Sequence, residues 1–311
     1  MEPVLSLGAM PPANAYLTRS ELERPEQCYP LDLNHCIECG MVQLAHVVPA
    51  ELLYRHYSFR TGSSKRMAEH FARLMSSVTD GLPAGSLVVE IGSNDGTALA
   101  SAGGGLRMLG VDPATNIARI ANARGVRTIC DYWSESLAAD VLRASGPATV
   151  IVAANVLGHV DDLDDFLRGV RRLLLLSPRG RFVFEVPYLG DLIRQTAYDT
   201  IYHEHLSYFA LGPLRRLLAR HRLEIRTVER FPVHGGTIRC TAAIGDGASD
   251  VADGEDWLFD PQTFGEFRQR VRRLRSETRE RLERFRGKRI VGYGAPAKGT
   301  VLLNYCGIGA D

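Results

Sequence analysis

Four consecutive residues near the middle of the chain gather side chains that exchange protons near neutral pH. They are Tyr202, His203, Glu204 and His205: a phenol, two imidazoles and a carboxylate. Imidazole has the unperturbed pKa closest to physiological pH, and a neighbouring carboxylate can fix its tautomer or share its proton. The tetrad, as residues 202–205 are called below, fits general acid–base chemistry; the alternative is a solvated polar turn. The remaining motifs decide between these two readings.

The composition is that of a globular protein of about two domains. Of 311 residues, 45% are hydrophobic, and 37 basic against 36 acidic side chains give a net charge of +1. This balance argues against a nucleic-acid partner, and the lack of a long apolar run argues against a membrane span. The first residues do not resemble a signal peptide, and six scattered cysteines do not make a disulfide framework. We therefore expect a reduced, cytoplasmic setting.

Short apolar runs alternate with helical patterns in the part of the chain that precedes the tetrad. Strands are predicted at 86–92, 106–111, 149–153 and 181–186, and helices at 63–78, 116–124 and 161–176. After the tetrad, we predict a helix at 211–221, strands at 223–228 and 237–244, and a long amphipathic helix with a solvated charged face at 261–286. Residues 289–294 are predicted to form a strand that leads into a second glycine loop. Strands that alternate with helices predict an α/β fold with a doubly wound parallel sheet.

A glycine loop follows the first of these sheet strands. Its polar and glycine residues are Glu90, Gly92, Asn94, Asp95 and Gly96. Glycines let a backbone pass close to a ligand, and open α/β sheets bind ligands at the carboxyl ends of their strands. The loop matches neither pattern of the common phosphate-binding loops. The alternatives are a nicotinamide-binding sheet and a structural glycine turn.

An acid also ends the next strand, at Asp112, where a carboxylate can accept hydrogen bonds from both hydroxyls of a ribose. The combined pattern resembles class I S-adenosylmethionine-dependent methyltransferases, which have a Rossmann-like sheet. The resemblance implies that residues 90–96 wrap the amino-acid end of S-adenosylmethionine and that Asp112 binds its ribose. It also implies that Asp131 and Tyr132 face the adenine and that Asn155 lies beside the methionine moiety.

Further segments extend the resemblance over nearly the whole chain. They are residues 36–40 (CIECG), 57–59 (YSF), 90–96, 155–159 (NVLGH), 202–205, 234–239 (HGGTIR) and 292–299 (GYGAPAKG). Together and in this order they resemble the sugar C-methyltransferase family, whose members methylate a carbon of a nucleotide-linked deoxy sugar. The resemblance implies a zinc-ribbon-like N-terminal module, a methyltransferase domain and a C-terminal nucleotide-sugar domain.

Methylation of carbon requires a carbanion equivalent, which a keto sugar supplies when a base removes the proton next to its carbonyl. The resemblance makes His205 that base, with Glu204 and Tyr202 orienting it or stabilising the enolate oxygen. It places Tyr57 and His159 in the same pocket, although His159 could instead bond a local carbonyl.

The other histidine of the tetrad, His203, is expected to support the neighbouring backbone. A His-x-His spacing also suits a metal ion, but the sulfonium donor is already an electrophile. In the C-terminal part, Arg239 is predicted to contact a diphosphate, or alternatively to form a surface ion pair. Gly292 and Lys298 belong to the loop that resembles the family's nucleotide-facing loop.

The chain departs from the family pattern at both ends. A zinc ribbon has two Cys-x-x-Cys pairs, whereas this chain has one, Cys36 and Cys39, with Cys28 as a third thiol out of position. We therefore expect an incomplete zinc set. The C-terminal domain is expected to be partial, so the chain looks truncated at both ends. The predicted divisions are 1–60, 61–210 and 211–311.

The predicted activity is methyl transfer from S-adenosylmethionine to a carbon of a nucleotide-linked keto-deoxysugar. The alternatives are an O- or N-methyltransferase that acts on a small metabolite, and an inactive truncated homologue. The expected partner is a small molecule, with neither nucleic acid nor membrane involved. The sequence does not specify the sugar, the carbon or the oligomeric state.

Overall fold

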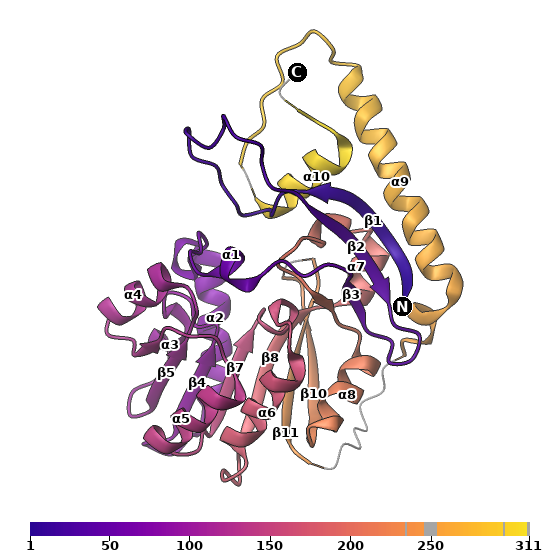
Figure 1. The fold of residues 1–311 in the computed structure, drawn as a ribbon. Helices are drawn as coiled ribbons and strands as arrows, with labels where there is room; N and C mark the ends of the chain where they lie inside the picture. Colours follow the sequence, from indigo (N-terminus) through magenta and orange to yellow (C-terminus); the bar gives the residue numbers. More distant parts are fainter. Residues whose placement is uncertain (234, 246–253, 295, 310–311) are drawn as a thin grey trace.

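The structure is a computed structural model that describes residues 1–233, 235–245, 254–294 and 296–309. His234 and Ala295, which belong to two of the motif segments, lie outside the described residues. Figure 1 shows a lower α/β body and an upper part in which the N-terminal strands lie beside the long C-terminal helix.

A seven-stranded sheet forms the centre of the α/β body. Its order is β10-β11-β8-β7-β4-β5-β6; the pairs among β4 to β8 are parallel, and β11 is antiparallel to both β8 and β10. The strands are β4 (Leu87–Ile91), β5 (Arg107–Val111), β6 (Thr128–Ile129), β7 (Val150–Ala154), β8 (Arg181–Pro187), β10 (Leu223–Phe231) and β11 (Thr237–Ile244). The predicted doubly wound α/β sheet is confirmed, and it continues past residue 210 into β10 and β11.

Helices cover both faces of this sheet. They are α2 (Lys65–Thr79), α3 (Thr97–Ala100), α4 (Thr115–Ala123), α5 (Glu135–Ser145), α6 (Leu163–Leu174) and α8 (Leu211–Arg220). One apolar core joins the sheet to α2, α3 and α4, and a second joins it to α5, α6 and α8. Helix α6 shows how the sequence specifies this packing: Asp162 caps its first turn, Arg171 and Arg172 occupy its last turn, and its apolar stripe is buried.

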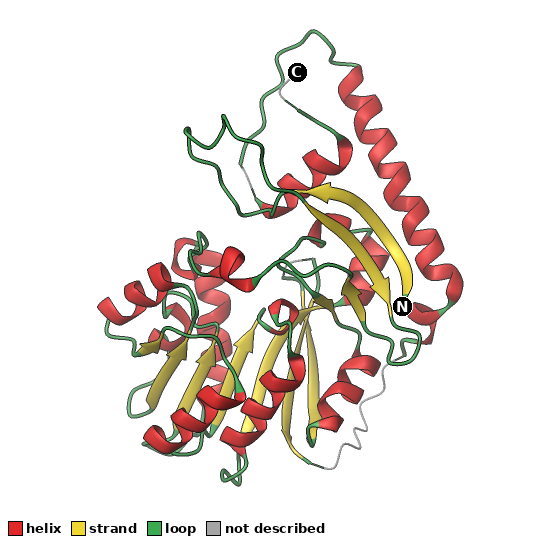
Figure 2. Cartoon of the chain, viewed as in Figure 1, coloured by secondary structure: helices red, strands yellow, loops and turns green. Residues whose placement is uncertain are grey.

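A second, four-stranded antiparallel sheet lies beside the body (Figure 2). Its order is β1-β2-β3-β9, formed by β1 (Glu2–Met10), β2 (Tyr29–His35), β3 (Val42–Leu44) and β9 (Ser207–Tyr208). The short strand β9 directly follows the tetrad, and Val42 of β3 pairs with Tyr208. The N–H of Leu206 also donates to the carbonyl of Gly158 at 2.6 Å. The tetrad is therefore fixed between the two sheets.

Three helices share an apolar core with the four-stranded sheet. They are α7 (Leu189–Gln195), α9 (Pro261–Glu283) and α10 (Ala297–Cys306). Arg268 of α9 adds hydrogen bonds to the carbonyls of Pro3 and Val4, at 2.7 and 2.9 Å. The long amphipathic helix predicted at 261–286 corresponds to α9, and its apolar positions face the N-terminal strands.

The strand predicted at 289–294 is wrong. These residues are described and form an exposed segment, in which Val291 is 79% and Tyr293 fully exposed. No described strand lies beside them, and a single strand cannot satisfy its backbone hydrogen bonds or bury its faces. The remaining short elements are α1 (Ala50–Tyr54), η1 (Thr61–Ser63), η2 (Leu157–His159), η3 (Tyr198–Thr200) and η4 (Asp256–Phe259).

Candidate active site

A cavity of about 740 Å³ lies at the carboxyl ends of the sheet strands. Its lining includes residues of the N-terminal segment, the loops after the sheet strands, the tetrad and the start of α10, together with residues of α2, α3 and α6. The size suits a small molecule together with a cofactor. The tetrad contributes Tyr202 and His205 to the same cavity as Glu90 of the glycine loop.

The glycine loop is shaped by backbone conformations that require glycine. Gly92 has φ +69°, and a Cβ there would lie 2.5 Å from Cγ2 of Val156. Gly96 has φ +75°, and its Cβ would lie 2.9 Å from Val126. An L side chain at either position would therefore be strained by its backbone and by a steric clash. The turn brings the backbone after β4 to the edge of the cavity.

Buried acceptors beside this loop lack partners. Glu90 is 4% exposed, and its Oε2 has no hydrogen-bond partner among the described residues; the same holds for Oδ1 of Asn155. Burial, reinforced by the charges of Asp112 and Asp95, raises the pKa of Glu90 well above its usual range. Buried acceptors are normally paired, so this pair fits a bound molecule that donates hydrogen bonds.

Asp112 ends β5 as predicted and is held by two backbone N–H groups. Asn94 donates to its Oδ2 at 2.8 Å, and Ala114 donates to its Oδ1 at 2.9 Å. Burial nevertheless raises the pKa of Asp112. Asp131 and Tyr132 line the same cavity as Asp112. The three residues assigned to the ribose and the adenine therefore face one space.

Asn94 and Asp95 also bond the segment in front of α2. Oδ1 of Asn94 accepts from the N–H of Thr61 at 2.8 Å. Oδ2 of Asp95 accepts from the N–H of Gly62 at 3.2 Å and pairs with Arg124 at 3.1 Å. Asn94 lines the cavity, whereas Asp95 and Gly96 are not among its described lining residues. These contacts hold residues 59–62 over the loop.

The ring of His205 is oriented by a backbone group. Its Nδ1 lies 2.8 Å from the carbonyl oxygen of Thr200. A carbonyl can only accept, so Nδ1 carries the proton and Nε2 is the basic nitrogen. The ring of Tyr202 lies 4.0 Å away, centroid to centroid. Burial raises the pKa of Tyr202, so its phenol keeps its proton.

Glu204 contacts the N-terminal segment. The residue is 1% exposed. Its Oε1 accepts from Nδ2 of Asn14 at 2.6 Å, and its Oε2 accepts from the hydroxyl of Tyr57 at 3.0 Å. Burial raises the pKa of Glu204, and the two donors lower it. The contact that orients His205 thus comes from Thr200, while Glu204 holds Tyr57 and Asn14 against the tetrad.

The two other histidines of these motifs have different surroundings. His159, in η2, lines the cavity, and its ring stands at 81° to that of His205 with centroids 5.0 Å apart. Its Nδ1 lies 3.1 Å from the hydroxyl of Tyr54, and burial lowers the pKa of His159 to about 4. His203 is 1% exposed, and its Nε2 lies 3.1 Å from the carbonyl of Tyr29. It supports the backbone of β2.

Of the predicted substrate contacts, Lys298 lines the cavity at the start of α10. Arg239 is 6% exposed, and its guanidinium lies 2.7 Å from the carboxylate of Glu185. His70 contacts the same carboxylate at 2.8 Å. Gly292 lies in the exposed segment after α9. Neither Arg239 nor Gly292 belongs to the described lining of the cavity.

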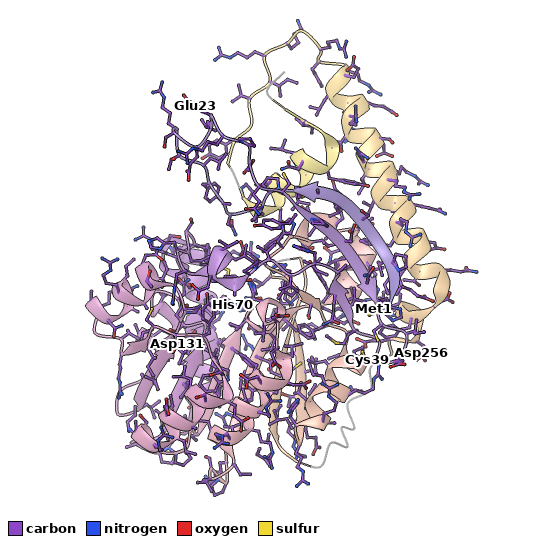
Figure 3. All side chains as sticks on the ribbon, in the orientation of Figure 1. Met1, Glu23, Cys39, His70, Asp131 and Asp256 are labelled. Carbon is purple, nitrogen blue, oxygen red and sulfur yellow. The ribbon has the colours of Figure 1, made fainter. Side chains whose placement is uncertain are left out.

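Cys36 and Cys39 flank one turn, closed by the hydrogen bond from Gly40 N to the carbonyl of Cys36 at 2.8 Å. The amides of Cys39 and Glu38 lower the pKa of the Cys36 thiol. Within the described part of the chain, no three His, Cys, Asp or Glu side chains gather as metal ligands. Two thiols do not fit a closed zinc site. Figure 3 shows Cys39 and Asp131 on opposite sides of the molecule.

Three side chains or groups of the site were not predicted: Asn14, Tyr54 and the carbonyl of Thr200. The first two lie in the N-terminal part, far along the chain from the tetrad that they contact. Tyr54 stands three positions before Tyr57, which is the one sequence signal that pointed to this region. Thr200 acts through its backbone, which residue identity does not reveal.

Three known protein families match consecutive parts of this chain. Family models match residues 1–54 ("Putative zinc binding domain"), 54–228 ("Methyltransferase domain") and 232–311 ("C-methyltransferase C-terminal domain"). The chain is 35% identical over 320 aligned positions to the C-methyltransferase NovU of Streptomyces niveus, covering 98% of this chain and 76% of that protein. It belongs to the S-adenosylmethionine-dependent C-methyltransferases. The predicted family is confirmed.

Solved structures similar to this C-methyltransferase include an S-adenosylmethionine-dependent methyltransferase from Clostridium acetobutylicum (13% identity, TM-score 0.45, 59% of this chain and 94% of that one). Another is magnesium protoporphyrin IX methyltransferase from Synechocystis (14% identity, TM-score 0.41, 56% and 78%). None of the helices described here has the length and apolar character required to cross a membrane.

Proposed function

We propose that this C-methyltransferase methylates a carbon next to the ketone of a nucleotide-linked deoxy sugar, through an enolate. The observation that carries the proposal is the contact between His205 and the carbonyl of Thr200. Its Nδ1–H is held by the carbonyl of Thr200 at 2.8 Å, so its Nε2 is the proton-accepting nitrogen, and the ring lines the cavity. A positioned imidazole that accepts protons is suited to act as a general base.

The cofactor half of the cavity suits S-adenosylmethionine, which supplies an electrophilic methyl group on its sulfonium. Glu90 and Asn155 offer unpaired buried acceptors, which fit its ammonium group. Asp112, Asp131 and Tyr132 line the same cavity, which supports assigning Asp112 to the ribose hydroxyls and the other two to the adenine. The turn at Gly92 allows the close approach of backbone that such a ligand needs.

In the proposed reaction, Nε2 of His205 takes the proton from the carbon next to the carbonyl. The electrons of the C–H bond move into the enolate, whose oxygen gains negative charge. The neutral phenol of Tyr202, which packs on His205, is suited to donate a hydrogen bond to that oxygen. The enolate carbon then forms the new bond to the methyl group, and His205 returns its proton to solvent.

The nucleotide end is assigned to the start of α10. Lys298 lines the cavity there, and the first N–H groups of the helix lack a side-chain cap. A lysine beside a helix N-terminus is a favourable place for a diphosphate. Arg239 has its guanidinium engaged by Glu185, so the diphosphate contact is assigned to Lys298 in its place.

The test uses labelled S-adenosylmethionine and a thymidine diphosphate 4-keto-deoxysugar. We expect label on a sugar carbon with the wild-type chain. Without the donor, we expect exchange of the acidic carbon-bound hydrogen for solvent deuterium. His205→Asn should abolish both while leaving donor binding, measured by calorimetry, unchanged. Label on oxygen or nitrogen, or full exchange with His205→Asn, would refute the proposal.

A further inference from the structure

Tyr54, at the end of α1, has a role that the assignments above leave open. Its hydroxyl lies 2.9 Å from the backbone carbonyl of Glu204 and 3.1 Å from Nδ1 of His159. A hydroxyl has one proton, and a carbonyl can only accept. The proton of Tyr54 therefore points to Glu204, and the hydroxyl oxygen must accept from His159.

This arrangement determines the tautomer of His159. Because Nδ1 donates to Tyr54, Nε2 carries the lone pair and is the acceptor of the ring. Burial raises the pKa of Tyr54 well above its usual range and lowers that of His159 to about 4, so both groups are neutral near pH 7. His159 is therefore held as an uncharged hydrogen-bond acceptor.

The second imidazole of the site makes the same kind of contact. His205 donates its Nδ1–H to the carbonyl of Thr200, and its ring stands at 81° to that of His159. Two imidazoles therefore line one cavity, with ring centroids 5.0 Å apart, and each has its Nδ1 bonded to an oxygen. The reaction removes one proton from carbon and needs one base. The acceptor of His159 is thus available to recognise a donor group on the substrate.

We propose that Tyr54 is a positioning residue that fixes His159 as an acceptor for a hydroxyl of the sugar substrate. The choice of a hydroxyl rests on the proposed function, because a keto-deoxysugar carries hydroxyls as its donor groups. His159 then determines specificity, and Tyr54 acts through it. A substrate without that hydroxyl leaves the imidazole nitrogen unpaired in the cavity, which reduces the binding of its transition state.

The first experiment measures the tautomer directly and uses no substrate. Nitrogen NMR of the full chain with ¹⁵N-labelled histidine distinguishes protonated Nδ1 from protonated Nε2, and the signals of His159 are assigned from their loss in His159→Asn. We expect protonated Nδ1 in the wild type and a shift toward protonated Nε2 in Tyr54→Phe. Tyr305→Phe, a tyrosine in α10, should leave the spectrum unchanged. An unchanged His159 tautomer in folded Tyr54→Phe would overturn the positioning role.

The second experiment measures selectivity. Wild type should prefer the hydroxylated keto sugar over each matched analogue that lacks one hydroxyl, and for one analogue by between about 10- and 100-fold in kcat/KM. Tyr54→Phe should reduce that ratio at least several-fold, with unchanged affinity for S-adenosylmethionine. Equal ratios in the two proteins would contradict the recognition of a hydroxyl. If wild type places no label on carbon, the proposed function fails, while the tautomer measurement still decides the role of Tyr54.

Discussion

Two tyrosines of the N-terminal segment bond the same residue of the tetrad in different ways, which permits a controlled measurement. Tyr57 donates to the side-chain Oε2 of Glu204 at 3.0 Å, whereas Tyr54 donates to its backbone carbonyl at 2.9 Å. Substitution of Glu204 by leucine removes the acceptor of the first bond and leaves that of the second. A double-mutant cycle on stability therefore separates the two contacts.

The expected coupling follows from the type of bond. When Glu204 is ionised, a hydrogen bond to its buried carboxylate contributes about 1.5–3 kcal/mol to stability. Tyr57→Phe and Glu204→Leu should therefore couple by about that amount, measured by urea unfolding of the four proteins. Tyr54→Phe and Glu204→Leu should be additive within about 0.5 kcal/mol, because the carbonyl remains.

The cycle also has a pH signature. The hydroxyl of Tyr57 lowers the pKa of Glu204, so it favours the ionised carboxylate. The coupling should be largest near neutral pH and decrease as the pH falls through the pKa of Glu204. If the Tyr57 cycle is additive at neutral pH, or if the Tyr54 cycle couples as strongly, Glu204 does not tie Tyr57 to the tetrad and the reasoning fails.

Three further substitutions test buried groups of the cavity. Burial and the charge of Asp112 raise the pKa of Glu90, so wild type loses stability as the pH rises through that pKa. Glu90→Gln should therefore have a higher Tm than wild type at neutral pH, and the difference in Tm should disappear in acid. The same substitution should weaken the binding of S-adenosylmethionine measured by calorimetry. Burial lowers the pKa of His159 from 6.5 to about 4, so wild type should lose stability as the pH falls across that window, and His159→Gln should lose less in urea titrations. Gly92→Ala places a Cβ 2.5 Å from Val156 at φ +69°, and thermal unfolding should show a loss of about 1–3 kcal/mol; an unchanged Tm would contradict the strain.

The centre of the sheet of the α/β body was predictable because β4, β7 and β8 are buried on both faces. Every residue of β4 is buried, and apart from Glu90 the strand is an apolar run bounded by turn residues. The four-stranded sheet was not predictable in the same way. Register shifts interrupt β1 after Pro3 and after Ser6, which breaks the alternation that identifies a half-buried strand.

The candidate site likewise has parts that the sequence predicts and parts that it does not. The glycine loop and the tetrad are local motifs, so sequence order placed Glu90 and His205 in one cavity. The partners of the tetrad come from distant segments, such as Asn14, or act through the backbone, such as the carbonyl of Thr200. Arg239 looked available for a ligand because its partner Glu185 lies on another strand, and only the pairing of β8 with β11 brings the two together.

The pairing of β3 with β9 has a consequence for the order of synthesis. Val42 can pair with Tyr208 only after Tyr208 has been synthesised, which is on the order of ten seconds after Val42 at ordinary rates of translation. Until then, β3 is an open edge that invites pairing with other chains. The pairing of β3 with β9 is one of the contacts that hold the adjacent tetrad. We infer that the nascent chain is vulnerable to aggregation during this interval, and that catalytic competence is among the last properties that the folding protein acquires.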